Sequence, residues 1–250
     1  MTRDTLTHFD QTGWAVAPGF FSAAEVAEMS GWIDELLARP EVPGTLWVYH
    51  QPSLLDPSRQ LVQRIENFCP HHTGFDALAH QSRLQTAAGQ MLRGSVFLFK
   101  EKINFKESGG AGFELHQDQQ AGWSRYAPLF VTAMVCVDAA TIDNGCLEMP
   151  GASPRFDRLI GEEWRPVNDG EATGLTMLPV PTQPGDAVFF DSYVPHASKA
   201  NMSSGQRRVL FFTYNSQVHG DQRAAYHADK HASFPPDIER VPGAEYRFKV

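Results

Sequence analysis

Three residues carry the strongest chemical signal in the sequence: His116, Asp118 and His196. His116 and Asp118 are two positions apart, so on a β-strand both side chains would leave the same face and reach one metal ion. His196 follows a Gly-Asp turn and an apolar strand, which would deliver its imidazole at the far end of that strand. Two histidines and one carboxylate are the facial set that holds Fe(II) and leaves positions open for a co-substrate and O2.

The His-x-Asp pattern alone is weak, because composition already produces it. A chain of 250 residues with 10 His and 15 Asp is expected to contain about 0.6 such pairs by chance. The sequence has four such pairs: His8/Asp10, His116/Asp118, His219/Asp221 and His227/Asp229. The first pair could be completed by His72 as the third ligand, with Arg83 eleven residues later, which is the distance from His196 to Arg207. However, His72 follows no predicted strand and Arg83 lies in a predicted helix. The two C-terminal pairs have no strand after them, so the context favours His116, Asp118 and His196.

A basic residue follows His196 at a spacing that suits the binding of a small molecule beside the metal. Arg207 comes eleven residues later and leads into an apolar run at 209–214. Its planar, permanently charged guanidinium suits the free carboxylate of a small diacid bound near the metal. Arg208 is the alternative, because neighbours on a strand face opposite ways and only one of the two can point inward. The spacing favours Arg207.

The composition limits the class of protein and its partners. Hydrophobic residues make up 42% and charged residues 20%, which is typical of a packed globular chain. The net charge of −8 argues against nucleic acid as the main partner. Three cysteines do not form a zinc-finger pattern, the polar N-terminus has no targeting segment, and no apolar run could span a membrane. We therefore expect a cytoplasmic protein that acts on a small molecule.

The elements that must position these residues are mainly strands. A capping box at 22–25 predicts a helix that ends near Pro40, and a second helix is expected over 75–92. Strands are expected at 46–49, 95–106, 129–137, 175–180, 187–190 and 209–214, separated by Gly, Pro, Asn and Asp. We expect one domain: a helical N-terminal support (1–94), a jelly-roll core (95–215) and a C-terminal extension (216–250).

Four segments together resemble the phytanoyl-CoA dioxygenase (PhyH) family of Fe(II)/2-oxoglutarate-dependent oxygenases. They are GAGFELHQD at 110–118, DNGCLEMPG at 143–151, GDAVFF at 185–190, and HASKAN at 196–201 leading to Arg207. The resemblance implies a double-stranded β-helix, cupin-like core with flanking helices. It implies Fe(II) at His116, Asp118 and His196, and 2-oxoglutarate held by Arg207 and assisted by Ser198. The implied reaction hydroxylates an unactivated C–H with O2 and releases succinate and CO2.

The strand before the metal pair supplies further pocket candidates. Residues 97, 99, 103 and 105 are expected on one face, and the polar residues Lys100, Lys102, Asn104 and Lys106 on the other. In the family this strand lines the pocket, although a solvated face would give the same pattern. We assign Lys102 to the 2-oxoglutarate site, and Asn104 and Lys100 to the substrate pocket.

Three residues after the metal pair are weaker candidates. Trp123 and Tyr126 lie on an expected lid segment at 119–126, where they would cover the substrate or merely pack. Thr132 begins the next strand and is expected to face 2-oxoglutarate.

The substrate is the least determined part of the prediction. The lysine face suits a compact anion, and the segment around residues 101–118 is similar to bacterial relatives that hydroxylate aminoalkylphosphonates such as 2-aminoethylphosphonate. Amino acids, other small acids or amines, and acyl-CoAs stay open. Two alternatives remain: a jelly-roll metalloenzyme that does not use 2-oxoglutarate, of the epimerase or epoxidase type, and a non-catalytic β-sandwich that binds a ligand.

Overall fold

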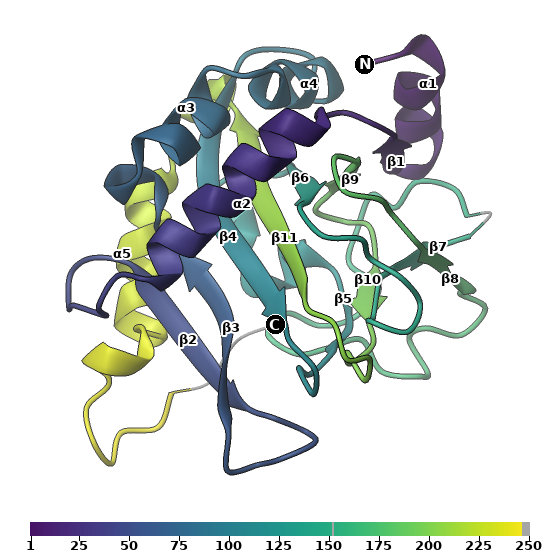
Figure 1. The fold of residues 1–250 in the computed structure, drawn as a ribbon. Helices are drawn as coiled ribbons and strands as arrows, with labels where there is room; N and C mark the ends of the chain where they lie inside the picture. The colour runs from purple at the N-terminus through teal and green to yellow at the C-terminus, as the bar shows by residue number, and fades with distance from the viewer. Residues whose placement is uncertain (152, 247–250) are drawn as a thin grey trace.

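Two antiparallel sheets form the centre of the computed structural model, which describes residues 1–151 and 153–246 (Figure 1). The larger sheet has seven strands in the order β1-β9-β6-β11-β4-β3-β2, and the smaller sheet has four in the order β5-β10-β7-β8. The strands are β1 (Trp14–Ala17), β2 (Trp47–Pro52), β3 (Gln60–Glu66), β4 (Val96–Lys106), β5 (Phe113–His116), β6 (Phe130–Cys136), β7 (Leu147–Pro150), β8 (Met177–Val180), β9 (Ala187–Asp191), β10 (His196–Ser198) and β11 (Arg207–Ser216). This two-sheet arrangement agrees with the expected jelly-roll core.

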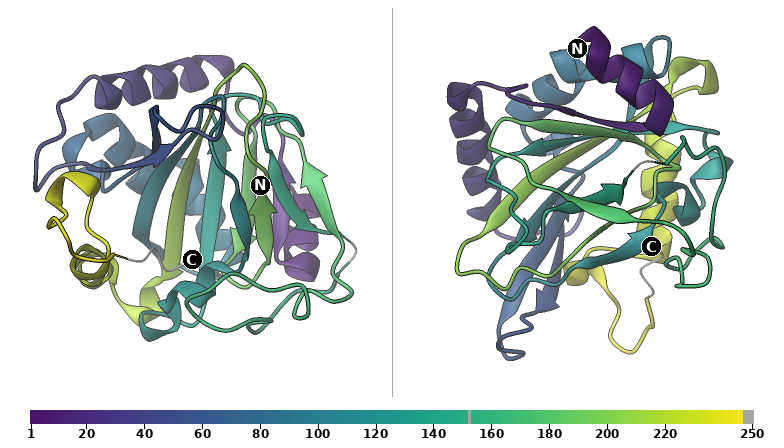
Figure 2. Two further views of the ribbon diagram at one scale, coloured as in Figure 1. Left: turned by 90° about the horizontal axis from the view of Figure 1, so that it is seen from below. Right: turned by 90° about the vertical axis from the view of Figure 1, so that its right-hand side faces the viewer.

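Four of the five α-helices pack on the outer face of the larger sheet, away from the smaller one, whereas the C-terminal helix lies on the other side, beside Phe99 and Trp123 (Figures 1 and 2). The α-helices are α1 (Arg3–Thr12), α2 (Ala23–Leu37), α3 (Thr73–His80), α4 (Arg83–Met91) and α5 (Arg223–Ser233). Short 3-10 turns are η1 (Cys69–His71), η2 (Asp118–Ala121), η3 (Trp123–Arg125), η4 (Gln217–His219) and η5 (Asp237–Glu239). In the described ranges, no helix is long and apolar enough to cross a membrane.

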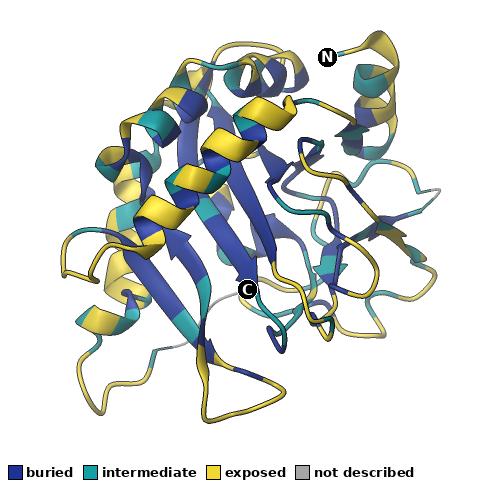
Figure 3. Cartoon of the chain, in the orientation of Figure 1, coloured by how far each residue is buried: buried dark blue, intermediate teal, exposed yellow. Residues whose placement is uncertain are grey.

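Alternation along the central strands builds two separate apolar layers. Leu210 and Phe212 of β11 pack with buried residues of α2, α3 and α4. Their neighbours Val209 and Phe211 face the smaller sheet and pack with Leu147 and Met149 of β7. Each central strand is therefore buried on both faces, as the burial colouring of Figure 3 shows. A sheet held between two apolar layers gives the site a rigid base.

Two expectations about the elements are wrong. The capping box of Ser22 and Glu25 starts α2 as expected, but the helix expected over 75–92 is two helices, because Ser82 leaves helical geometry and caps α4. In β4 the ladder to β11 pairs Lys100 with Thr213 and Leu98 with Tyr214, which leaves Phe99 as an extra residue in a β-bulge.

The bulge changes the side of the sheet on which Phe99 lies. Leu98, in place of Phe99, joins Ile103 and Phe105 in the layer under the helices. Phe99 packs instead with Trp123 and Tyr226. The first 94 residues also contain three strands of the larger sheet, so the sheet begins before β4.

Candidate active site

The structure brings His116, Asp118 and His196 together although 78 positions separate Asp118 from His196 in the sequence. His116 ends β5, and His196 begins β10 directly opposite it in the antiparallel pair. Asp118 begins η2, just beyond β5. One possible ligand atom from each residue lies within 4.8 Å of the others. Two imidazoles and one carboxylate at this spacing fit the donor set of a non-haem Fe(II) site.

Backbone carbonyl groups fix the orientation of both imidazoles. Nδ1 of His116 lies 2.7 Å from the carbonyl oxygen of Glu114, and Nδ1 of His196 lies 3.0 Å from that of Val194. With Nδ1–H donating in each case, Nε2 is left as the lone-pair donor for a metal. Burial and the neighbouring His196 lower the pKa of His116 to about 3. Neutral imidazoles are the form that binds a metal ion.

The neighbouring His196 and Lys102 keep the Asp118 carboxyl ionised. Burial opposes its charge, but His196 and Lys102 outweigh burial, and the pKa of Asp118 falls below its usual value. The Thr132 hydroxyl donates to Asp118 at 3.5 Å and lies 2.9 Å from the Thr213 hydroxyl. Thr132 therefore contacts the carboxylate and is not among the residues that line the two cavities described below.

A small inner cavity lies between the two sheets beside the histidines. Its lining includes four of the predicted residues, Lys102, Asn104, Ser198 and Arg207, together with His116 and His196. The cavity measures about 30 Å³, so it holds only one end of a small diacid. Lys102, Phe113 and His116 also line a second, larger cavity, so the two spaces are neighbours beside His116.

Arg207 is buried without a counter-charge among the residues that the structure describes. Its Nη1 donates to the carbonyl oxygen of Gly145 at 2.8 Å, whereas its Nε is buried with no hydrogen-bond partner. Burial lowers the pKa of Arg207 to about 10. Such an unsatisfied buried donor fits the far carboxylate of 2-oxoglutarate.

Arg208 occupies a different environment and is held by acidic groups. Its Nε and Nη2 donate to Asp138 at 2.9 Å each, and its Nη1 pairs with Asp34 of α2 at 3.2 Å. The two arginines thus point to opposite faces of β11, and the inward one is Arg207.

The three lysines predicted on one face of β4 lie in two different environments. Lys106 lines neither cavity, because its Nζ donates to the Ser198 hydroxyl at 2.7 Å and to the carbonyl oxygen of Lys199. Burial lowers the pKa of Lys106 to about 6. Lys100 and Lys102 line the larger cavity, so none of the three is on a solvated face.

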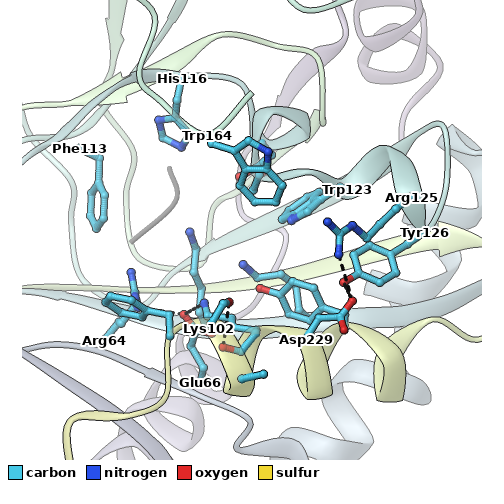
Figure 4. A pocket seen from close by; sticks show the side chains of 18 residues that line it. Arg64, Glu66, Lys102, Phe113, His116, Trp123, Arg125, Tyr126, Trp164 and Asp229 are labelled. Atoms are coloured by element: carbon cyan, nitrogen blue, oxygen red, sulfur yellow. Dashed lines mark hydrogen bonds and ion pairs between the residues drawn. The ribbon is translucent and has the colours of Figure 1, made fainter. Parts of the chain in front are cut away.

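The larger, outer cavity measures about 320 Å³ and begins at His116 and Asp118 (Figure 4). Lys100, Trp123 and Tyr126 lie in its wall. In Figure 4, His116 and Phe113 lie at one end, and Tyr126, Arg125 and Asp229 lie at the other. The space beside the candidate metal ligands therefore continues into a pocket of a size that suits a small metabolite.

Much of the outer cavity wall comes from segments to which we assigned no site residue. Strand β3 contributes Arg64 and Glu66, and a long loop contributes Trp164. Six further residues come from α5 and the segment directly after it: Tyr226, Asp229, Lys230, Ala232, Ser233 and Phe234. These positions carry no motif. One feature of the sequence could have indicated them: the C-terminal stretch places aromatic and charged residues at helical spacing.

Ion pairs organise the charges of this wall. Buried Glu66 accepts from Lys230 at 2.7 Å and pairs with Arg64 Nε at 2.9 Å. Burial opposes the charge of Glu66, but Lys230 and Arg64 hold its pKa far below the usual value. Asp229 accepts from the Tyr126 hydroxyl at 2.6 Å and pairs with Arg125 at 3.3 Å.

The ammonium groups of Lys100 and Lys102 contact aromatic rings instead of carboxylates. Lys100 Nζ lies 5.1 Å from the ring centre of Trp123, and Lys102 Nζ lies 4.7 Å from that of Phe211. Burial and Lys100 lower the pKa of Lys102 to about 8. In the part of the chain that the structure describes, neither ammonium group has an ion-pair partner.

Known sequences and folds are similar to this chain over most of its length. The Phytanoyl-CoA dioxygenase (PhyH) family model matches residues 9–209. A 2-aminoethylphosphonate dioxygenase of uncultured bacterium HF130_AEPn_1 is 37% identical over 245 residues, covering 98% of this chain and 93% of that protein. A methylphosphonate hydroxylase of Gimesia maris is 36% identical over 234 residues, covering 94% of this chain and 88% of that protein.

Solved structures share the fold at lower identity. EctD from S. alaskensis, solved with 2-oxoglutarate and 5-hydroxyectoine, superposes with a TM-score of 0.71 at 21% identity, over 88% of this chain and 77% of EctD. The epimerase SnoN superposes with a TM-score of 0.69 at 20% identity, over 97% of this chain and 92% of SnoN. The chain belongs to the phytanoyl-CoA dioxygenase (PhyH) family and is an Fe(II)- and 2-oxoglutarate-dependent dioxygenase.

Proposed function

We propose that this enzyme hydroxylates a C–H bond of a small organophosphonate, with 2-aminoethylphosphonate as the first candidate. The observation that carries the proposal is the outer cavity beside the candidate metal ligands, whose described lining has five cationic residues and three acidic ones, Asp118 included. A compact anion would find paired charges and aromatic walls there. Two relatives above 35% identity are named for phosphonate substrates, which supports the same class.

We propose that His116, Asp118 and His196 hold Fe(II). The bound iron supplies the oxidising chemistry: one oxygen atom of O2 enters the succinate formed from 2-oxoglutarate with loss of CO2, and the other enters the hydroxyl group of the product. The carbonyl contacts of the two histidine Nδ1 atoms fix the ring orientations, so little reorganisation is needed when the metal binds. The Thr132 hydroxyl supports the Asp118 carboxylate from outside the cavities.

We propose that Arg207 binds the far carboxylate of 2-oxoglutarate in the inner cavity, assisted by Ser198. The near end of the diacid then extends past His116, where the inner and outer cavities are neighbours. Lys102 lines both spaces and lies between co-substrate and substrate. A planar guanidinium makes two parallel hydrogen bonds to a carboxylate, which fixes the position of the co-substrate as well as its charge.

The aromatic wall of the outer cavity keeps water away from the reacting carbon. Trp123 and Tyr226 are buried and line the cavity, and Phe99 packs behind both rings. Excluding water protects a reactive site from side reactions. We also propose the cytoplasm as the compartment, because Cys69, Cys136 and Cys146 are buried free thiols.

The proposal is tested first without oxygen and then with it. Adding Fe(II) and then 2-oxoglutarate under anaerobic conditions is expected to produce the weak visible charge-transfer band of the chelate. Under air, a panel of alkylphosphonates, amino acids and acyl-CoAs is then compared by succinate release and by phosphorus NMR. We expect phosphonates to stimulate succinate release with matching hydroxylated product. Absence of the band, or stimulation by another class and not by phosphonates, would contradict the proposal.

A further inference from the structure

We propose that the outer cavity selects its substrate by charge, and that Lys100 and Lys102 make it prefer a doubly charged phosphonate head group over a singly charged sulfonate or carboxylate of similar size. The inference rests on the proposed function, because it takes the outer cavity as the substrate site. It goes further by assigning the discrimination to two named ammonium groups and by predicting which close analogues are rejected.

The placement of the two lysines is the first argument. They are two residues apart on β4, so both side chains leave the same face of the strand. Lys100 Nζ lies 5.1 Å from the ring centre of Trp123 and 5.4 Å from that of Tyr226. Lys102 Nζ lies toward the inner end, 5.9 Å from the ring centre of Phe113. Aromatic faces stabilise an ammonium group, but they leave its charge uncompensated.

The other charges of the lining already have partners, which is the second argument. Glu66 is shared by Lys230 and Arg64, and Asp229 pairs with Arg125. Asp118 belongs to the group of three that could hold a metal. Among the described residues of the lining, Lys100 and Lys102 are thus the two cationic side chains with no carboxylate at ion-pair distance.

These two ammonium groups predict the charge of the ligand. A buried ammonium group without a counter-ion is unfavourable, so a bound anion that supplies the missing charge gains more than it would in water. Fe(II) and 2-oxoglutarate bring opposite charges of equal size, so together they add no net counter-charge for the two ammonium groups. A phosphonate dianion matches two positive charges, whereas a sulfonate has nearly the same tetrahedral shape and only one negative charge.

Binding measurements separate charge from shape and from catalysis. We would measure the affinity of the enzyme loaded with Fe(II) and 2-oxoglutarate, without oxygen, by titration calorimetry at a pH at which the phosphonates are dianionic. Two matched pairs are compared: 2-aminoethylphosphonate with 2-aminoethylsulfonate, and methylphosphonate with methanesulfonate. We expect each phosphonate to bind roughly tenfold or more tightly than its sulfonate, the size of one charge-assisted hydrogen bond.

Variants of Lys100 assign the effect to a residue. Lys100→Gln is expected to weaken phosphonate binding about tenfold and sulfonate binding less, whereas Lys100→Arg keeps the preference because it keeps the charge. Lys199→Gln removes a lysine whose side chain is exposed and paired with Glu148, and it should match the wild type. The charge-transfer band and the melting temperature verify that each variant is folded and binds 2-oxoglutarate.

The outcomes distinguish this inference from the proposed function. Equal affinity of the wild type for both members of each pair, or equal loss of both in Lys100→Gln, would overturn charge selection even if phosphonates are hydroxylated. Selective phosphonate binding that Lys100→Gln removes, with no phosphonate-dependent succinate release, would support charge selection and contradict phosphonate hydroxylation.

Discussion

At the scale of single residues, the geometry of the site is set by backbone contacts of the histidines. Each imidazole is tied through Nδ1 to a carbonyl two residues earlier, so the ligand atom is positioned before a metal arrives. His196→Ala removes one of three metal donors, and we expect loss of Fe(II) binding and of turnover, measured by the charge-transfer band and succinate release. His219→Ala is the control, because His219 is exposed on η4. Equal effects of both substitutions would show that the wrong histidines were chosen.

The adjacent arginines of β11 provide a matched pair at the same scale. Arg207→Met removes the buried guanidinium that faces the inner cavity, and we expect the KM for 2-oxoglutarate to rise about tenfold or more. Arg208→Met removes pairs to Asp138 and Asp34 instead. We expect it to lower the melting temperature and leave that KM unchanged. An unchanged KM in Arg207→Met would place the co-substrate carboxylate elsewhere.

At the scale of elements, the sequence could predict what depends on local spacing. The separation of His116 and Asp118 indicated a shared face but occurs in four His-x-Asp pairs, and the choice among these pairs depended on the turn and strand before His196. The bulge at Phe99 was not, because reading alternation assumes an unbroken ladder of pairs. The contribution of α5 was not predictable either. The contact of Lys230 in α5 with Glu66 in β3 joins residues that are 164 positions apart in the sequence, and no local pattern indicates it.

Helix α5 is fixed to the sheet by buried ion pairs, and this leads to a prediction about substrate binding. Arg223 pairs with Glu101, whose side chain is fully buried. Arg223→Met would leave that carboxylate without its partner, and we expect the free energy of unfolding to fall by about 3 kcal/mol. Because α5 walls the outer cavity, phosphonate affinity should fall while the 2-oxoglutarate band persists.

Arg93→Met is the control for α5, because it removes an exposed pair with Asp10. Denaturant unfolding is expected to show a change of at most about 1 kcal/mol for this variant. Phosphonate affinity that stays unchanged in folded Arg223→Met would show that the anchoring of α5 does not shape the substrate pocket.

At the scale of the whole molecule, the site joins the two sheets. His116 and His196 come from the smaller sheet, whereas Arg207 and Lys102 come from the larger one. Side chains from both sheets meet around the inner cavity, so a metal and a co-substrate bound there would connect them. Ligands that bind only the folded state stabilise it in proportion to the logarithm of their concentration over Kd.

This connection predicts stepwise stabilisation by the two cofactors. Fe(II) alone, added without oxygen, is expected to raise the melting temperature, and 2-oxoglutarate added afterwards is expected to raise it again. At 100 times Kd each ligand contributes about 2.7 kcal/mol. Arg207→Met should keep the first increment and lose most of the second, whereas His196→Ala should lose both, because the diacid then has no metal beside it. A 2-oxoglutarate increment of wild-type size in Arg207→Met would show that the larger sheet does not hold the co-substrate through this residue.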